Sequence, residues 1–487
     1  MKRRPLFGLG IRAAFVAPFA LAVGLVAPER AEACGGCFIP PGEPTVVTGH
    51  RMAMTVSPTQ SVLWDSIQYS GEPEDFAWVL PVKKGARIES ANSAFFEVLE
   101  GVTATRIVQP YIDCGGGESG CGTAQYASED AYSGGLESPS AGGEQDPVEV
   151  VHHGNVGPYE TVTLATDTPG ALNQWLEDHG YNVDASSQPI IDQYVAENFD
   201  FIALRLQPGK GVQQMTPVRI VSEGSNVALP LRMVAIGTGA QTPIILYVIG
   251  EGRYRVRDFA DVSVEPDLLT WNFKNQSSNY ASLHDATLKA NDGKAFITSY
   301  AAAGTLVGPA GDQTTGPLFF PERYGLQAFQ NGESATQCSP IVDSFDDPIV
   351  RNPCPPDEPW DSPACGTVGE GELDARTLGC PGVDDVAVAL EGIHLQSSWV
   401  TRLEGNLPQS ALTADLVLEA APDQSYESGI IQATIALQPE YACGSATPIV
   451  LTPGDPKPGA PLTLVFGATL AAVGVAFAAR RAKRARA

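Results

Sequence analysis

The chain of 487 residues predicts an α+β protein in which strands dominate, mostly in antiparallel sheets with a few short helices. Three observations support this prediction. β-Prone stretches separated by turn residues recur along the chain, and a few short segments carry helix start and stop signals. The C-terminus holds an 18-residue apolar run. A disulfide-rich insertion and a C-terminal transmembrane helix complete the expected architecture.

The first strands are expected to form an antiparallel meander. Three stretches are rich in β-prone residues: Thr45–Val56, Gln60–Tyr69 and Asp75–Val82. The turn sequences Ser57–Pro58 and Ser70–Pro73 join them. Further strands are predicted at Phe201–Leu206, Pro217–Val221, Leu229–Ala235, Ile244–Ile249 and Ala295–Tyr300.

Four short helices are predicted from apolar faces and terminal signals. The clearest has Thr168 as its N-cap, Pro169 at its first position and Gly180 after its last residue. Another is expected to stop at Gly101. The predicted ranges are Ser93–Glu100, Pro169–His179, Pro189–Glu197 and Asn279–Leu288.

Residues 1–33 have the features of a secretory signal peptide. Basic residues precede the apolar stretch Ala13–Ala27, and Ala31 and Ala33 supply the small residues that a signal peptidase requires. Cleavage there would make Cys34 the first mature residue. Lipidation is not favoured, because Ala31 and Glu32 do not fit the lipoprotein pattern, and general secretion is favoured over twin-arginine export.

The C-terminus is predicted to anchor the protein in a membrane. As a helix, Leu462–Ala479 would reach about 27 Å, enough to cross the apolar layer of a bilayer. A Pro/Gly-rich linker (446–460) precedes the span (461–479), and the basic tail (480–487) favours a cytoplasmic C-terminus with the bulk of the chain exported. Simple anchoring is favoured over removal by a sorting enzyme, because Gly459–Pro461 lacks a cleavage signature.

Between these ends we expect one long exported domain with an insertion. Residues 34–306 would form the main domain, 307–384 the Cys/Pro-rich insertion and 385–445 the strands that complete the domain. The chain carries a formal net charge of −26, and its basic ends leave the exported part more acidic still, which excludes nucleic acid as a partner. Since neither calcium-loop nor zinc-ligand spacing occurs, no metal site and no cofactor are predicted.

Nine cysteines in an exported chain predict disulfide bonds. Cys114 and Cys121 flank a glycine-rich stretch and are expected to pair locally. Four cysteines between Cys338 and Cys380 lie in a segment with too few aliphatic residues for its own core, so two bridges are expected there. The full set is Cys34, Cys37, Cys114, Cys121, Cys338, Cys354, Cys365, Cys380 and Cys443.

Cys34 and Cys37 form a C-x-x-C motif, which thiol-disulfide enzymes place at a helix N-terminus. Phe38–Gly42 contains two prolines and does not favour a helix, so a structural role is preferred. The sequence motifs of zinc proteases, serine hydrolases and nucleotide-binding proteins are absent. His152 and His153 would point to opposite faces of a strand, which disfavours joint metal ligation.

The run Ile67–Val82 resembles the signature of a bacterial family known as domain of unknown function 2330. The resemblance covers most of the exported region. It implies membership of that family but brings no established reaction and no catalytic residues. Similar segments are Cys34–Phe38, Val156–Glu160, Trp175–Tyr181, Phe201–Leu206, Pro230–Arg232, Ala295–Tyr300, Thr401–Leu403 and Ala414–Leu418.

The favoured hypothesis is a membrane-anchored, non-catalytic binding or structural module of the cell envelope, with an envelope protein or a glycan as partner. The alternatives are a thiol-disulfide oxidoreductase using Cys34 and Cys37, and a hydrolase whose active site assembles from distant residues. Aromatic side chains beside carboxylates suit recognition, although the same segment is also typical of a hairpin turn before a core strand. The candidate binding residues are Tyr69, Glu72, Asp75, Phe76, Trp78 and Pro81.

Overall fold

Apolar residues on both faces of one strand, β4 (Ala77–Lys83), decide how the main layers are arranged. Trp78, Leu80 and Val82 lie in a core cluster between two sheets. Val79 belongs to a second cluster, on the opposite face. Because side chains alternate across a strand, a strand of this kind has to be covered on both sides. β4 therefore lies in a middle layer.

The computed structural model describes residues 37–38, 46–70, 77–112, 148–179, 187–210, 215–235, 240–304, 306, 308–309, 341–342, 347–355, 358–360, 362–377 and 385–442. These residues fall into two units. The larger unit comprises the described residues within 1–107, 124–265 and 280–431, and the smaller unit those within 108–123, 266–279 and 432–487.

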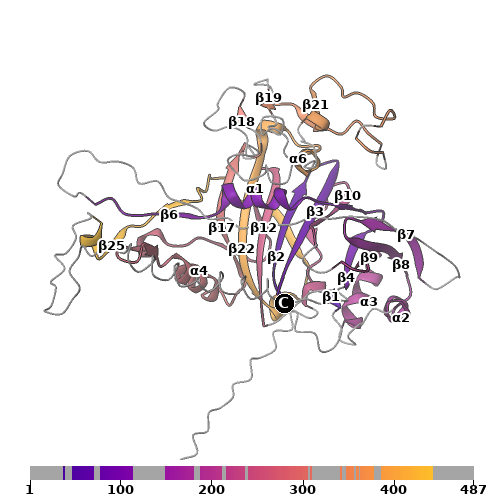
Figure 1. The fold of residues 1–487 in the computed structure, drawn as a ribbon, viewed down its shortest axis with the longest axis horizontal. Coiled ribbons are helices and arrows are strands. Elements are labelled where there is room, and N and C mark those ends of the chain that lie inside the picture. Colours follow the sequence, from indigo (N-terminus) through magenta and orange to yellow (C-terminus); the bar gives the residue numbers. More distant parts are fainter. Residues whose placement is uncertain are drawn as a thin grey trace, which may run out of the picture. The chain divides into compact units, whose positions relative to one another are not determined.

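The larger unit is built on an eight-stranded sheet (Figure 1). β12 pairs in parallel with β2, and β14 pairs in parallel with β17, while the other neighbours are antiparallel. The strands, in spatial order, are β14 (Ala260–Val262), β17 (Ala295–Ala303), β22 (Ser398–Pro408), β12 (Gln241–Glu251), β2 (Val46–Val56), β3 (Gln60–Ser70), β10 (Val218–Glu223) and β5 (Arg87–Ser90).

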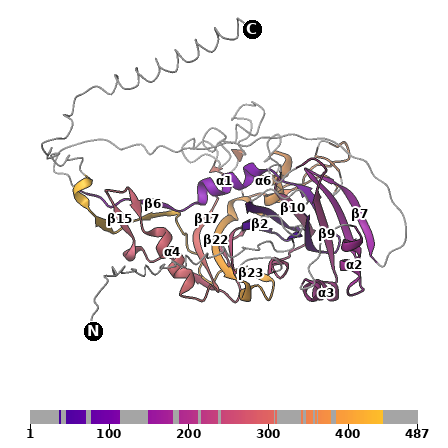
Figure 2. The same ribbon diagram turned by 60° about the horizontal axis from the view of Figure 1, so that its bottom comes forward.

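A five-stranded antiparallel sheet packs against this one through the cluster that contains Trp78. Helices α2 (Ala171–Asp178) and α3 (Gln188–Ala196) cover its other face, where Trp175 and Tyr194 are buried (Figures 1 and 2). The strands, in spatial order, are β1 (Cys37–Phe38), β4, β9 (Phe199–Leu206), β8 (Tyr159–Ala165) and β7 (Glu149–Val156).

The opposite face of the eight-stranded sheet carries helices. Phe95 and Phe96 of α1 (Ser93–Thr103) pack with Trp64, and α6 (Asp385–Leu390) joins the same cluster. Figure 1 shows α1 lying across the strands of this sheet. A further helix of this unit is α4 (Tyr280–Lys289).

Short strands and 3-10 helices complete the described residues. β15 (Thr270–Asn272) pairs with β16 (Ser277–Ser278) and β25 (Ile435–Leu437) in the smaller unit. The other small sheets contain β11 (Ala228–Leu229), β23 (Leu416–Ala420) and β13 (Tyr254–Val256); β18 (Gly308–Pro309) and β19 (Ile341–Val342); β20 (Ile349–Arg351) and β21 (Glu372–Asp374); and β6 (Arg106–Val108) and β24 (Ile430–Gln432). The 3-10 helices are η2 (Met233–Ala235), η3 (Pro266–Leu268), η6 (Ala375–Thr377), η7 (Leu395–Ser397), η8 (Gln409–Ala411) and η9 (Pro439–Tyr441).

The strand-dominated, mostly antiparallel architecture is confirmed, but the predicted three-stranded meander is wrong. β2 and β3 pair as expected, whereas β4 leaves them and pairs with β1 and β9 in the other sheet. Between β1 and β9, β4 buries one apolar face against the eight-stranded sheet and the other under α2 and α3. The strand predicted at Leu229–Ala235 is also wrong, because β11 ends at Leu229 before Pro230, which has no N–H to continue a ladder.

Two helix boundaries differ from the predictions. α1 continues past Gly101 to Thr103, whose hydroxyl donates to the Leu99 carbonyl at 2.5 Å, and packing of its aromatic face offsets the low helix propensity of glycine. α2 begins at Ala171 after Gly170, which has a positive φ of 79°. The Gly170 N–H donates to Asp192 on α3, so Thr168 does not act as the side-chain cap.

Within the described ranges, no helix is both long enough and apolar enough to cross a membrane. The predicted signal peptide and the predicted span at Leu462–Ala479 lie outside those ranges. So do most of the cysteines, namely Cys34, Cys114, Cys121, Cys338, Cys380 and Cys443.

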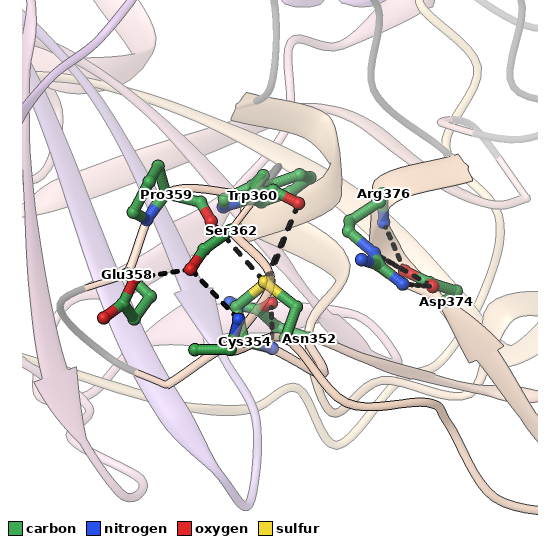
Figure 3. Close-up of a disulfide and its surroundings, with 10 residues drawn as sticks. Asn352, Cys354, Glu358, Pro359, Trp360, Ser362, Asp374 and Arg376 are labelled. Atoms are coloured by element: carbon green, nitrogen blue, oxygen red, sulfur yellow. Dashed lines mark hydrogen bonds and ion pairs between the residues drawn. A yellow bond between two sulfur atoms is a disulfide. The ribbon is translucent and has the colours of Figure 1, made fainter.

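One disulfide of the predicted insertion is present, between Cys354 and Cys365 (Figure 3). Both sulfur atoms lie near the Trp360 carbonyl, at 3.8 Å and 3.7 Å, and the Trp360 side chain packs against the core cluster of Trp64. The bridge therefore closes a short loop onto the larger unit.

Replacing Cys354 and Cys365 together with serine should lower the free energy of unfolding by about 2–3 kcal/mol, because the unfolded chain gains the entropy of an open loop. Urea unfolding of the oxidised protein and of the variant measures this difference. Adding a reductant should lower the stability of the unchanged protein at least to that of the variant, because it also opens any other disulfide of the chain. Equal stability of all three samples would contradict a structural role for the bridge.

Candidate functional site

The predicted binding residues that the structure describes lie in strands, and two of them are internal. Trp78 is 3% exposed and Pro81 is buried, both in β4. Tyr69 lies in β3. Glu72, Asp75 and Phe76 are outside the described residues. Trp78 and Pro81 thus belong to the protein interior, and a binding role for the other four residues stays a prediction.

Trp78 and Pro81 line two small neighbouring cavities between the sheets. Trp78 lines a cavity of about 10 Å³, whose wall includes the buried pair His50 and Asp65. Pro81 lines a cavity of about 30 Å³, whose wall includes Lys83. A cavity of the first size holds about one water-sized group, and neither approaches the several hundred Å³ of a metabolite pocket.

A largely buried cluster of charged side chains surrounds Glu404 on β22. Arg402 Nε donates to Glu404 Oε1 at 2.8 Å, and Ser299 donates to the same oxygen at 2.6 Å. His284 Nε2 lies 3.1 Å from Oε2. Arg402 also contacts Glu100 at 2.9 Å. Glu404 is thus held by three side chains from three different elements.

Burial works to raise the pKa of Glu404, but the hydrogen bond from His284, the positive charge of Arg402 and the hydrogen bond from Ser299 outweigh it. The net result lowers the pKa of Glu404 to about 2. The carboxylate is therefore ionised at neutral pH and accepts hydrogen bonds from its neighbours.

This cluster is not arranged for nucleophilic catalysis. Activation of a serine requires a hydrogen bond from its hydroxyl to a general base such as histidine. Here Ser299 and His284 are directed to different oxygens of Glu404 instead. The cluster is best explained as an ion-pair network that joins β17, β22 and α4, which gives no support to the hydrolase hypothesis.

Cys37 is the one cysteine of the redox motif that the structure describes, and Cys34 lies outside the described residues. Cys37 lies in the short strand β1, opposite Trp78 of β4, whereas an activated thiolate is stabilised at a helix N-terminus. His152 and His153 lie on β7, and His153 Nε2 is 3.5 Å from Glu160. Neither feature assembles a catalytic group within the described residues.

A larger groove lies in the smaller unit. Its volume is about 360 Å³, within the range typical of small-ligand sites. Backbone hydrogen bonds hold its walls: Ala433 N donates to Val108 O at 2.8 Å, and Phe273 N donates to Leu437 O at 3.1 Å. The lining residues are Val108, Gln109, Pro110, Tyr111, Ile112, Phe273, Gln432 and Ala442.

The groove is lined by uncharged aromatic, aliphatic and amide side chains, although the chain as a whole is acidic. Tyr111 is 84% exposed, whereas Phe273, which also lines the groove, is 3% exposed. Gln109 and Gln432 supply exposed amides. Among the described lining residues none carries a charge at neutral pH. Aromatic faces beside amides can stack on a ligand and exchange hydrogen bonds with its hydroxyl or amide groups.

Sequence reasoning missed this groove, because its walls come from three segments that are far apart along the chain. Residues 113–272 separate Val108–Ile112 from Phe273 along the chain, and Gln432 follows the predicted insertion. The exposed Tyr111 is the single local signal, and an isolated exposed aromatic residue is common on protein surfaces.

Comparison with known proteins gives a family. Residues 28–303 match the bacterial family described as "Uncharacterized protein conserved in bacteria (DUF2330)". The chain belongs to this family. The DUF2330 match covers more than half of the chain and includes Trp78, Pro81 and both small cavities. No curated protein and no solved structure matches the chain.

Proposed function

We propose that the protein is an exported, membrane-tethered and non-catalytic binding module of the cell envelope, and that the groove of the smaller unit binds an uncharged glycan. The predicted signal peptide and C-terminal span support export and tethering. The Cys354–Cys365 disulfide supports an oxidising compartment, since such bonds persist mainly outside the cytoplasm.

The groove is the observation that carries this proposal. At about 360 Å³ it is the right size for one or two sugar rings, and its aromatic and amide side chains match a ligand with apolar ring faces and hydroxyl groups. The chain has a net charge of −26, so an anionic polymer would be repelled at long range. An uncharged glycan avoids this repulsion and needs no counter-charge in the groove.

Replacing Tyr111 with alanine should weaken glycan binding at least tenfold, because the exposed ring would supply the stacking face. Full-length protein in detergent micelles is titrated with neutral glycan fragments released from the envelope, and heat of binding is recorded. Replacing both Gln109 and Gln432 with alanine, with Tyr111 unchanged, should also weaken glycan binding relative to the unchanged protein.

Tyr426→Ala is the matched control, because Tyr426 is a 64% exposed tyrosine of the larger unit and does not line the groove. Its affinity should equal that of the unchanged protein. Loss of binding in Tyr426→Ala to the same degree, or unchanged binding in Tyr111→Ala, would refute a glycan site in the groove.

A further inference from the structure

The 10 Å³ cavity between the two sheets combines three kinds of side chain that rarely meet in a core. His50 and Met52 on β2, Asp65 on β3 and Met233 on η2 all contribute to its wall. The remaining lining side chains are apolar and include Trp78. One buried histidine and two buried methionines thus line one space of roughly atomic size.

The histidine is oriented by the carboxylate. His50 Nδ1 lies 3.5 Å from Asp65 Oδ1, and the two side chains are 1% and 5% exposed. Asp65 accepts at this distance, so the Nδ1 position carries the hydrogen and Nε2 keeps a free lone pair. Among the described residues His50 Nε2 is buried and has no hydrogen-bond partner. A buried acceptor without a partner is costly to a fold.

A metal-binding histidine has this arrangement. Such a residue almost always donates its other ring N–H to a carboxylate, which fixes the tautomer and raises the basicity of the ligating nitrogen. His50 and Asp65 have these relative positions. The cavity is thus lined by a histidine whose Nδ1 is held by a carboxylate and whose Nε2 has no hydrogen-bond partner among the described residues.

The thioether groups of Met52 and Met233 indicate which metal ion the site would prefer. Met52 and Met233 are each 1% exposed, and two of the five methionines in the chain line this one cavity. Thioether sulfur is a soft ligand that prefers Cu(I), and imidazole also suits copper. A single monovalent cation would be balanced by the one carboxylate, Asp65, whereas a divalent ion would keep an uncompensated charge in an apolar core.

We propose that His50, Met52 and Met233 bind Cu(I), with Asp65 as the positioning residue of the imidazole. The site lies between the sheets of the larger unit and within the DUF2330 match, and it is independent of the groove. It would allow the protein to hold or buffer copper outside the cytoplasm, in addition to binding a glycan.

The test is a Cu(I) titration of the full-length protein in detergent under anaerobic conditions. Free thiols are first alkylated without reduction, because cysteines would otherwise compete for copper. A colorimetric Cu(I) chelator competes for the metal, and X-ray absorption at the copper edge identifies its neighbours. We expect one Cu(I) per chain with sulfur and nitrogen neighbours.

Met52→Leu and Met233→Leu conserve side-chain volume, so both variants should fold. Each should lower Cu(I) affinity at least tenfold, and Asp65→Asn should lower it about 10–100-fold. Met54→Leu is the control, because Met54 is equally buried on the same strand but does not line this cavity. Its affinity should not change.

Retention of no Cu(I), or equal affinity in Met52→Leu, Met233→Leu and the control, would overturn the proposal. Copper with nitrogen and oxygen neighbours alone would also overturn it. In either case the cavity would be assigned to an ordered water on His50 Nε2.

Discussion

Replacing Asp385 with alanine should destabilise the protein by about 3–5 kcal/mol. Asp385 is 0% exposed, and its carboxylate accepts hydrogen bonds from Trp64, Asn92 and Arg219. Trp64 Nε1 donates at 2.7 Å, the Asn92 backbone N–H at 2.9 Å and Arg219 Nη1 at 3.0 Å. Replacing Asp385 takes the acceptor from the Trp64 indole and one counter-charge from the buried guanidinium of Arg219, which costs more than the contacts contribute.

Arg219 keeps its second partner, Glu89, at 2.7 Å. The remaining pair limits the loss to the stated range. Asp385→Asn retains an acceptor oxygen without the charge and should fall between alanine and the unchanged protein. Urea unfolding followed by tryptophan fluorescence measures all three, and Trp64 itself reports on the site.

Asp285→Ala is the matched control. Asp285 pairs with Lys289 at 4.0 Å on α4, and the two side chains are 62% and 78% exposed. Exposed pairs of this kind contribute at most about 0.5 kcal/mol. If Asp385→Ala were no less stable than Asp285→Ala, Asp385 would not be an anchor of the core.

The contacts of Asp385 also show that the matched family region depends on residues beyond its end. Residues 28–303 include Trp64, Asn92 and Arg219, while Asp385 begins α6 outside the match. β22 likewise lies outside the match, yet it stands between β17 and β12 in the eight-stranded sheet. A chain ending at residue 303 would lack both the internal strand β22 and one of the two carboxylates that pair with the buried Arg219.

Local sequence periodicity was sufficient to predict most strands and helices, but it did not predict which strands pair with one another. β2 and β3 were predictable as a hairpin, because both are β-prone and a short turn joins them. The sequence of β4 carried the relevant signal, apolar residues on both faces, but two-sided burial does not say which strands pair. Its pairing with β9 depends on a segment more than a hundred residues away.

The sites were less predictable than the fold for the same reason. Trp64 and Asp385 are separated by 321 residues, and no local pattern links an indole to a carboxylate at that distance. In the sequence, Met52 and Met233 have no feature that distinguishes them from other core methionines. Only the fold brings both into the wall of the cavity that His50 also lines. Trp78 and Pro81, two of the predicted binding residues, are internal and line small cavities, and a binding role for the segment Tyr69–Pro81 stays a prediction.

Replacing Glu404 with glutamine should lower the free energy of unfolding at pH 7 by roughly 3 kcal/mol and change its pH dependence. The pKa of Glu404 is about 2 in the folded protein and near 4.5 when unfolded. A depressed pKa stabilises the folded state above the unfolded value, and this stabilisation disappears as pH falls through the folded value. The difference of about 2.5 units corresponds to roughly 3 kcal/mol, lost between about pH 5 and pH 2.

Unfolding free energies measured from pH 7 to pH 2 distinguish the contribution of Glu404 from the contributions of other carboxylates. The unchanged protein should lose more stability over that window than Glu404→Gln, since the variant has no group to protonate at this position. Glu223→Gln, at the exposed end of β10, is the control and should follow the unchanged protein. Parallel curves for Glu404→Gln and the unchanged protein would mean that His284, Ser299 and Arg402 do not hold an ionised carboxylate, and the buried network on β22 would need a different protonation state.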